Sequence, residues 1–329
     1  MNETRPRYGV YAFYTNHESF ISGILNNIRD ADEIILCAAG STDGSTNVIK
    51  KYINENPDLN IRTFNAYIDP WRYDDIRNIG LSLMSPSIDL CICLDIEERL
   101  VPEWRSILDT CYDPEIAGYQ CYVQEEKDGR SKMTTECRIH RNGGCFWKYP
   151  VYEELMFDDS AKISLIPQVM IKKPYKEYHH DIVRLLYRYI KEQPSSWVPL
   201  WRLAQVLLDR GSLQDARNFI EKALQLNSCD KAKLYELKAR ICSAEGQSDE
   251  ALSFINKAII YKNDWDLHFE KARILSGMGR HLEAYISLLE ARKNHTNNMK
   301  DCPSTWDSDP EFVSFLAMEK KLALEEMNS

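Results

Sequence analysis

The chain has 329 residues, of which 44% are hydrophobic and 28% are charged, a globular composition with enough length for two domains. Its net charge of −9 argues against a general affinity for nucleic acid or anionic membranes, although it does not exclude a local basic groove. No run reaches the roughly 18 apolar residues of a membrane span, and the first residues lack a signal-peptide pattern. We therefore expect a cytoplasmic protein without a membrane span.

Short apolar runs alternate with amphipathic helical patterns through the first half of the chain. This alternation predicts an α/β unit with a mostly parallel sheet, because helices connect successive parallel strands and cover both faces of the sheet. In such sheets, ligands bind beyond the carboxyl ends of the strands. The expected strands are 8–14, 33–39, 60–68 and 89–95, and the expected helices are 17–28, 45–56 and 73–84.

The segment GSTDGS at 40–45 forms a turn between the second expected strand and the second expected helix. Gly40 and Gly44 allow a tight backbone, and Asp43 is placed to cap the helix that begins near Ser45. The segment has no lysine after its second glycine, so it is not a phosphate-binding loop of the G-x-x-x-x-G-K-S/T kind.

Two carboxylates, Asp95 and Glu97, follow the fourth expected strand in the sequence CICLDIEERL, with Glu98 beside them. Because the strand is ending there, both side chains can converge on one point. Carboxylate oxygens suit a hard divalent cation such as Mg²⁺ or Mn²⁺, which leaves positions for phosphate oxygens. The alternative is a solvated acidic turn after the strand.

The ten cysteines are scattered and lie mostly in apolar runs, with no C-x-x-C pair. This spacing predicts buried, reduced thiols and argues against a zinc site.

Small residues recur with a fixed period in the second half of the chain, where strand-like runs are absent. Gly211, Gly246 and Gly279 are spaced by 35 and 33 residues, which resembles tetratricopeptide repeats, whose small residues let two antiparallel helices approach closely. We therefore expect an all-α domain with three such repeats at 197–296. Alanines recur at positions 204, 239 and 272, at 216, 251 and 284, and at 223, 258 and 291.

The segments that flank the repeats are expected to cover their ends. Residues 179–193 would pack beneath the first repeat, and residues 309–326 would cap the last one. The adjacent His179 and His180 point in different directions on a helix, so we assign them a structural role. The predicted domains are 1–175 and 176–329, and the repeats would serve as a scaffold and in self-association, or present a concave surface to a partner.

Five ordered motifs between residues 8 and 175 resemble glycosyltransferase family 2, whose nucleotide-binding fold is called GT-A. Together with the repeats, the chain is similar in plan to bacterial S-glycosyltransferases that modify bacteriocin cysteines. The motifs are Asn16-His17-Glu18, the turn 40–45, Arg77-Asn78 after an aromatic segment, LDIEE at 94–98 and VYEEL at 151–155.

The resemblance implies a metal-dependent inverting glycosyltransferase that moves a hexose or pentose from a nucleotide-sugar, most readily a UDP-sugar, to an acceptor. The implied cofactor is Mn²⁺ or Mg²⁺, held by Asp95 and Glu97. Arg77 would face the diphosphate, or alternatively form a surface ion pair beside Asp74 and Asp75. The residues implied for nucleotide-sugar binding are Thr15, Asn16, Glu18, Asp43, Arg77 and Asp95.

The resemblance also implies a carboxylate base that deprotonates the acceptor hydroxyl or thiol within hydrogen-bond reach. Glu153 is the better candidate and Glu154 the second, unless both are acids of a solvated loop. The sequence departs from the family where Tyr152 replaces a histidine and Ala38 replaces an aspartate that contacts the nucleoside.

Lys172 and Lys173 lie where many relatives carry a histidine. Either lysine could contact diphosphate oxygens, or both could form a solvated pair before Pro174.

Two hypotheses follow for the whole chain. The first is an active glycosyltransferase whose acceptor is a peptide or protein side chain or a glycan, with a modified nucleic-acid base as a further alternative. The second is a binding or scaffold protein in which a degenerate transferase domain is joined to tetratricopeptide repeats. The repeats would also support a homo-oligomer.

Overall fold

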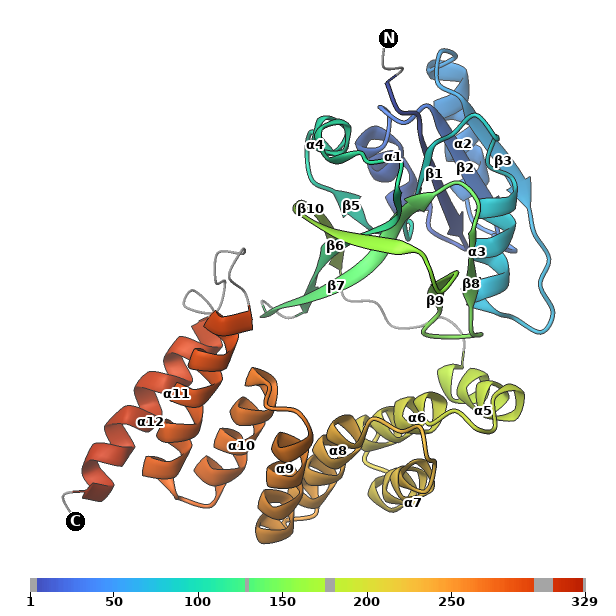
Figure 1. Ribbon diagram of the computed structural model, residues 1–329. Coiled ribbons are helices and arrows are strands. Elements are labelled where there is room, and N and C mark those ends of the chain that lie inside the picture. Colours follow the sequence, from blue (N-terminus) through green and yellow to red (C-terminus); the bar gives the residue numbers. More distant parts are fainter. Residues whose placement is uncertain (1–4, 128–129, 175–180, 299–309, 328–329) are drawn as a thin grey trace. The chain divides into compact units, whose positions relative to one another are not determined.

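The computed structural model describes residues 5–127, 130–174, 181–298 and 310–327, and the chain divides into two compact units between residues 185 and 186 (Figure 1). This division falls inside helix α5 (Ile182–Glu192). The predicted domain boundary at 175 and 176, and His179 and His180, lie outside the described residues.

An eight-stranded mixed sheet forms the centre of the first unit, in the order β3-β2-β1-β4-β7-β6-β10-β5. The first four strands of this order run parallel, as the alternating sequence pattern predicts. In the other half, β7 is antiparallel to β4 and β6, and β5 is antiparallel to β10, whereas β6 and β10 pair in parallel. The predicted mostly parallel sheet is therefore a mixed sheet, in which β7 and β5 run against their neighbours. The strands are β1 (Tyr8–Tyr14), β2 (Glu33–Ala38), β3 (Ile61–Asn65), β4 (Leu90–Cys93), β5 (Arg99–Leu100), β6 (Ile116–Lys127), β7 (Arg130–Arg141) and β10 (Lys162–Pro174).

Both faces of the parallel strands are covered, which explains why β1, β2 and β4 are apolar and buried along their whole length. Val10 and Ala12 face a core that includes α1, α2 and α4. On the other face, Tyr11 packs closely against Gly80 of α3, and the small hairpin of β8 (Cys145–Lys148) and β9 (Glu154–Phe157) lies beside that helix. The helices of this unit are α1 (Glu18–Asn27), α2 (Ser45–Glu55), α3 (Tyr73–Ser82) and α4 (Trp104–Cys111).

Two expectations from composition can be compared with the described residues. Their nine cysteines are free thiols, and five of them are buried as predicted, whereas the other four are only partly buried. None of their helices combines the length and the apolar character needed to cross a membrane.

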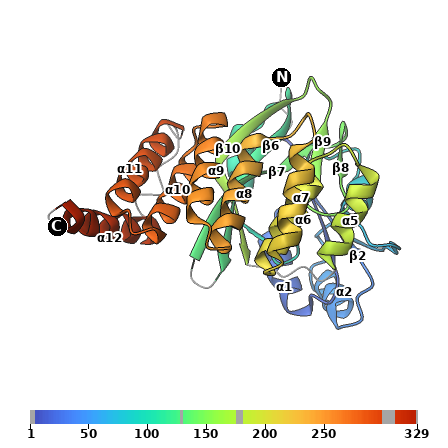
Figure 2. The same cartoon turned by 90° about the horizontal axis from the view of Figure 1, so that it is seen from below.

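The second unit consists of helices that follow one another as pairs, α6 with α7, α8 with α9 and α10 with α11 (Figure 2). All the alanines of the predicted columns have 0% exposed surface, so these columns are the contacts between helices. Ile190 of α5 packs against the core of the first pair, and Phe312 of the last helix packs with Ala272 and Leu288, as predicted for the two flanking segments. The helices are α6 (Val198–Asp209), α7 (Leu213–Leu224), α8 (Lys231–Ala244), α9 (Ser248–Tyr261), α10 (Trp265–Gly277), α11 (His281–Asn298) and α12 (Pro310–Met327).

The three periodic glycines each follow the first helix of a pair. Gly211, Gly246 and Gly279 have φ values of +77°, +76° and +73°, the left-handed conformation that glycine adopts without a steric penalty. Their spacing in the sequence is therefore the spacing of the turns within the helix pairs.

Candidate functional site

The loop after β1 holds the turn after β2 through hydrogen bonds at the carboxyl ends of the two strands. Oδ1 of Asn16 accepts from the backbone amides of Thr42 (2.8 Å) and Asp43 (3.2 Å). The backbone amide of Glu18 donates to Asp43 (3.0 Å), and the carboxylate of Glu18 accepts from the amide of Gly44 (3.1 Å). The predicted residues Asn16, Glu18 and Asp43 thus lie together, and the Thr15 hydroxyl bonds the neighbouring carbonyl of Ala39 (2.8 Å).

The sequence predicts Asp43 as the cap of α2, but the N-cap is Gly44, and Asp43 supports the start of the helix from the residue before it. Its Oδ1 accepts from the amide of Ser45, the first residue of the helix, at 3.0 Å. Although its slight burial acts in the opposite direction, hydrogen bonds from Ser45 and from the amide of Glu18 lower the pKa of Asp43. A Cβ at Gly44 would lie 2.4 Å from the Glu18 carboxylate, so a larger residue there would push the Glu18 side chain away from its bond to the amide of residue 44.

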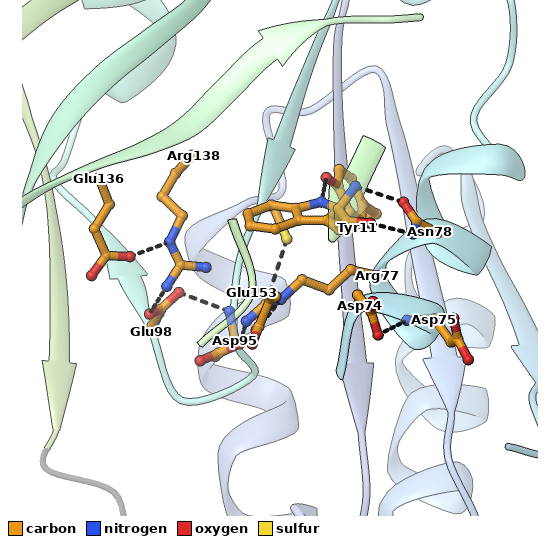
Figure 3. A network of polar contacts seen from close by, with 12 residues as sticks. Tyr11, Asp74, Asp75, Arg77, Asn78, Asp95, Glu98, Glu136, Arg138 and Glu153 are labelled. Carbon is orange, nitrogen blue, oxygen red and sulfur yellow. Dashed lines mark hydrogen bonds and ion pairs between the residues drawn. The ribbon is translucent and has the colours of Figure 1, made fainter. Parts of the chain in front are cut away.

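Arg77 of α3 joins two of the predicted acids in a buried network (Figure 3). Its Nη2 donates to Asp95 (2.8 Å) after β4, and its Nε donates to Glu153 (2.6 Å) just before β9. The guanidinium also lies over the rings of Trp147 (5.0 Å) and Phe13 (5.6 Å). Burial alone would lower the pKa of Arg77, but Cys93 and the two carboxylates outweigh it and raise that pKa.

The alternative of a surface ion pair between Arg77 and Asp74 or Asp75 is wrong. Arg77 is only 5% exposed, and Asp74 is bonded by Arg72 instead, at 2.7 Å. The helix turns Arg77 toward the sheet because it follows Tyr73 by four residues and therefore shares the face of that buried side chain.

Glu97, the second predicted metal ligand, is bonded to a histidine that the sequence reasoning passed over. His17 is 4% exposed, and its Nε2 lies 2.9 Å from Oε1 of Glu97. Its Nδ1 accepts from the amide of Thr15 (2.9 Å), so a neutral His17 carries its proton on Nε2 and donates it to Glu97. The His17 amide donates to Ser45 (3.0 Å), so this residue connects the turn to the acidic loop.

A second buried arginine, Arg138, continues the network from the other side. Glu98 is fully buried; its Oε2 accepts from the amide of Asp95 (2.7 Å), and its Oε1 accepts from Nη2 of Arg138 (3.0 Å). Nε of Arg138 donates to Glu136 (2.8 Å). Burial raises the pKa of Glu98 to about 7, although Arg138 acts against that shift. The sequence signal for this part was the spacing of Glu136 and Arg138, two residues apart on one strand.

The predicted residues Glu154, Lys172 and Lys173 make no hydrogen bond described above to the buried network of Arg77 and Arg138. Glu154 is exposed on β9 and faces Lys148 across the hairpin, so Glu153 is the acid of this pair that joins Arg77. Lys172 is exposed, whereas Lys173 is half-buried and close enough to Glu98 and Glu136 for its charge to act toward a lower pKa at both carboxyls.

No group of three or more His, Cys, Asp or Glu side chains surrounds a metal position within the described part of the chain. The predicted pair Asp95 and Glu97 offers two carboxylates from a single loop, each with one oxygen bonded to Arg77 or His17.

Comparison with known proteins identifies part of the helical unit. Residues 232–263, which include most of α8 and α9, match the tetratricopeptide repeat family. No curated protein matches the chain. Similar solved structures include TTC0263, a tetratricopeptide protein of Thermus thermophilus, with 18% identity over 41% of this chain and 71% of that one and a TM-score of 0.35.

Two further solved structures are also similar to part of this chain. MamA has 16% identity over 45% of this chain and 90% of that one, with a TM-score of 0.32. The Yersinia enterocolitica type III secretion chaperone SycD, in complex with a peptide of the translocator YopD, has 20% identity over 37% and 89%, with a TM-score of 0.32. The family match coincides with the second predicted repeat, so the helical unit contains a tetratricopeptide repeat.

Proposed function

We propose that the chain joins a repeat scaffold, which binds a protein or peptide, to an α/β unit that transfers a sugar from a nucleotide-sugar to an acceptor. The observation that carries the transferase part is the position of Arg77. It bonds both Asp95 and Glu153, which the family resemblance assigns to metal binding and to the base. Residues expected to act on one substrate are thereby held together at the carboxyl end of β4.

The proposed nucleotide position lies at the ends of β1, which is the parallel neighbour of β4, and of β2, which pairs in parallel with the other edge of β1. Asn16, Glu18 and Asp43 form one hydrogen-bonded group there, and His17 ties this group to Glu97. A ligand beyond these strand ends would meet the turn and the acidic loop together, as in other open α/β sheets.

The charges of the network support a divalent cation at Asp95 and Glu97. Five carboxylates (Asp95, Glu97, Glu98, Glu136 and Glu153) lie in or beside it, against the three cationic side chains of Arg77, Arg138 and Lys173. Fully ionised, these eight groups carry a net charge of −2, which favours a cation with oxygen ligands. When bound, Mn²⁺ or Mg²⁺ would neutralise charge on the departing diphosphate.

Glu153 is the proposed base for the acceptor. Arg77 holds its carboxylate at a fixed position beside Asp95, so that it can take the proton of an acceptor hydroxyl or thiol. Attack would come from the face of the sugar opposite the diphosphate, with inversion. A peptide or protein side chain suits a chain that carries repeats, a glycan is the alternative, and the net charge of −9 disfavours a nucleic-acid base.

The second candidate function is binding alone, with an α/β unit that has lost catalysis. The family match favours it, because that match falls on the repeats and none of the comparisons reported above names a transferase. Ala38 and Tyr152 also stand where the resembling family has functional side chains. The binding role is therefore supported more directly than the transfer reaction.

Titration calorimetry with UDP- and GDP-sugars, with and without Mn²⁺, separates the two candidates. We expect metal-linked binding to the wild type, loss of that binding in D95N, and no loss in D75N, whose half-exposed carboxylate lies outside the buried network. E153Q should bind the donor yet lose transfer and metal-dependent hydrolysis. A wild type that binds no nucleotide-sugar with metal would leave only the scaffold function.

A further inference from the structure

Arg138 has a buried nitrogen with no hydrogen-bond acceptor among the described residues. The side chain is 5% exposed, and two of its nitrogens are bonded to Glu98 (3.0 Å) and Glu136 (2.8 Å). The remaining nitrogen, Nη1, has no partner although it is buried. Figure 3 shows Arg138 between the two carboxylates, with this nitrogen directed away from both. Buried donors are almost always satisfied, so Nη1 requires an acceptor from outside the chain.

The backbone at Arg138 departs from regular strand pairing. In the register of β6 with β7, Tyr119 faces Ile139 and Gln120 faces Cys137, so the pairing skips Arg138, as in a β-bulge. Bulges of this kind are concentrated beside binding sites, where they redirect a side chain. The bulge and the unpaired nitrogen are independent observations on the same residue.

The charges around Arg138 decide which kind of acceptor suits it. Its single positive charge lies between two carboxylates, and Asp95 is bonded to one of them through its backbone amide. Lys173 offsets only part of this negative charge. A phosphate would therefore meet no excess positive charge here. A neutral hydroxyl group can accept from Nη1 and donate to a neighbouring carboxylate oxygen.

We propose that Nη1 of Arg138 donates a hydrogen bond to a hydroxyl oxygen of a neutral sugar, which makes Arg138 a residue that selects the sugar part of the ligand. This inference rests on the proposed transferase function and deepens it, because it separates the place of the sugar from that of the nucleotide. The sugar would lie beside Asp95, between the two buried guanidinium groups.

The test compares nucleotides with nucleotide-sugars. Arg138→Lys keeps a positive charge for Glu98 and Glu136 but has a single nitrogen in place of three and so lacks Nη1. Arg62→Lys, at a half-exposed ion pair with Glu33, is the matched control. With Mn²⁺ present, calorimetry is run with UDP, GDP, UDP-glucose, UDP-N-acetylglucosamine and GDP-mannose. We expect R138K to lose about tenfold in affinity for the preferred nucleotide-sugar while the affinity for its nucleotide changes less than about twofold. R62K should change neither affinity.

Two results of that titration overturn the proposal. An equal loss for nucleotide and nucleotide-sugar would place a phosphate at Arg138, and no loss for either would mean that Nη1 bonds only a buried water. If R138K does not fold, the double variant E98Q/R138Q replaces it, because that variant removes the guanidinium together with one buried carboxylate charge.

Binding of free monosaccharides tests the sugar site without requiring that the chain binds a nucleotide or transfers a sugar. Glucose, N-acetylglucosamine and mannose are tested by saturation-transfer NMR on the wild type and R138K. A wild type that binds no nucleotide but binds a free sugar in an Arg138-dependent way contradicts the transferase and retains the sugar site. Absence of Arg138-dependent binding of any free sugar and of any nucleotide-sugar overturns the inference itself.

Discussion

Oδ1 of Asp95 lies 2.8 Å from Nη2 of Arg77, and both side chains are largely buried. The same guanidinium bonds Glu153 at 2.6 Å, so one positive charge serves two buried carboxylates that come from distant parts of the chain. Removing a partner from such a group leaves charges in a medium that solvates them poorly. The arrangement therefore makes Arg77 important to folding as well as to any reaction at this site.

Arg77→Met should lower the free energy of unfolding of the α/β unit by about 3–5 kcal/mol, because Asp95 and Glu153 would both lose their buried partner. Arg5→Met is the control, since Arg5 is 63% exposed and solvent screens its pair with Asp109, which should therefore contribute little. Urea unfolding of both variants gives the comparison. Equal, small effects would show that Asp95 and Glu153 are held by other groups.

Patterns of short range in the sequence predicted the helical unit and the parallel half of the sheet well. The glycine and alanine columns mark turns and contacts between neighbouring helices. Helices that contact one another there are also close together in the sequence, so a short pattern can reveal them. The long strand β7 carries five charged residues among its twelve, and β6 has a mostly apolar first part followed by three charged residues, so neither strand shows the regular alternation that would mark it.

The candidate site was predicted less completely because its contacts join distant residues. His17 meets Glu97 across 80 residues, Arg77 meets Glu153 across 76, and Glu98 meets Arg138 across 40. Motif order singled out Arg77 within a helix, Asp95 after a strand and Glu153 in a later motif, but nothing local showed that Arg77 would bond the other two. His17 and Arg138 were missed for the same reason.

His17 should carry its proton on Nε2, because its Nδ1 accepts from the Thr15 amide. Long-range proton–nitrogen NMR spectra, assigned with His17→Gln, show which ring nitrogen is protonated. A protonated Nδ1 in neutral His17 would contradict the contact with Thr15.

Two amide substitutions separate the contacts of His17. Gln places an amide donor near the Nε2 position and can still donate to Glu97 (2.9 Å), whereas Asn reaches only the Nδ1 position. We expect H17N to destabilise the α/β unit by about 1–3 kcal/mol, because a largely buried carboxylate loses its donor, and H17Q to cost less. Equal losses in urea unfolding would mean that packing, rather than the bond to Glu97, explains the role of His17.

Gly246→Ala should destabilise the helical unit by about 1–2 kcal/mol, because its φ of +76° is unfavourable for any residue with a Cβ. Gly277→Ala is the matched control: that glycine lies in α10, and a Cβ there would meet no atom within 4 Å. Alanine is the better helix former, so G277A should be neutral or stabilise by up to about 1 kcal/mol. Thermal unfolding of each variant gives its change in stability. A loss of stability in G277A as large as that in G246A would refute the explanation by the backbone conformation of Gly246.

Glu98 should make the stability of the α/β unit fall as the pH rises. Burial raises its pKa from 4.5 to about 7, so the folded state holds the proton more tightly than the unfolded state does. The resulting stabilisation is complete below pH 4.5 and is lost as the pH rises toward 7. This difference between the folded and unfolded pKa of Glu98 corresponds to about 3 kcal/mol in the free energy of unfolding.

Glu98→Gln cannot ionise, so it should escape this loss. Glu98 accepts from the Asp95 amide and from Arg138 through different oxygens, whereas glutamine has one oxygen and can accept from only one of them, a cost that is the same at every pH. Its stability relative to the wild type should therefore rise by up to about 3 kcal/mol between about pH 5 and pH 8. The lowered pKa of Glu136, where Arg138 and Lys173 outweigh burial, acts in the opposite direction but is common to both proteins and largely cancels. Glu115→Gln, at a carboxylate that is 75% exposed, should show no such change. A constant difference between E98Q and the wild type across this range would mean that Glu98 is ionised throughout and that Arg138 fully offsets its burial.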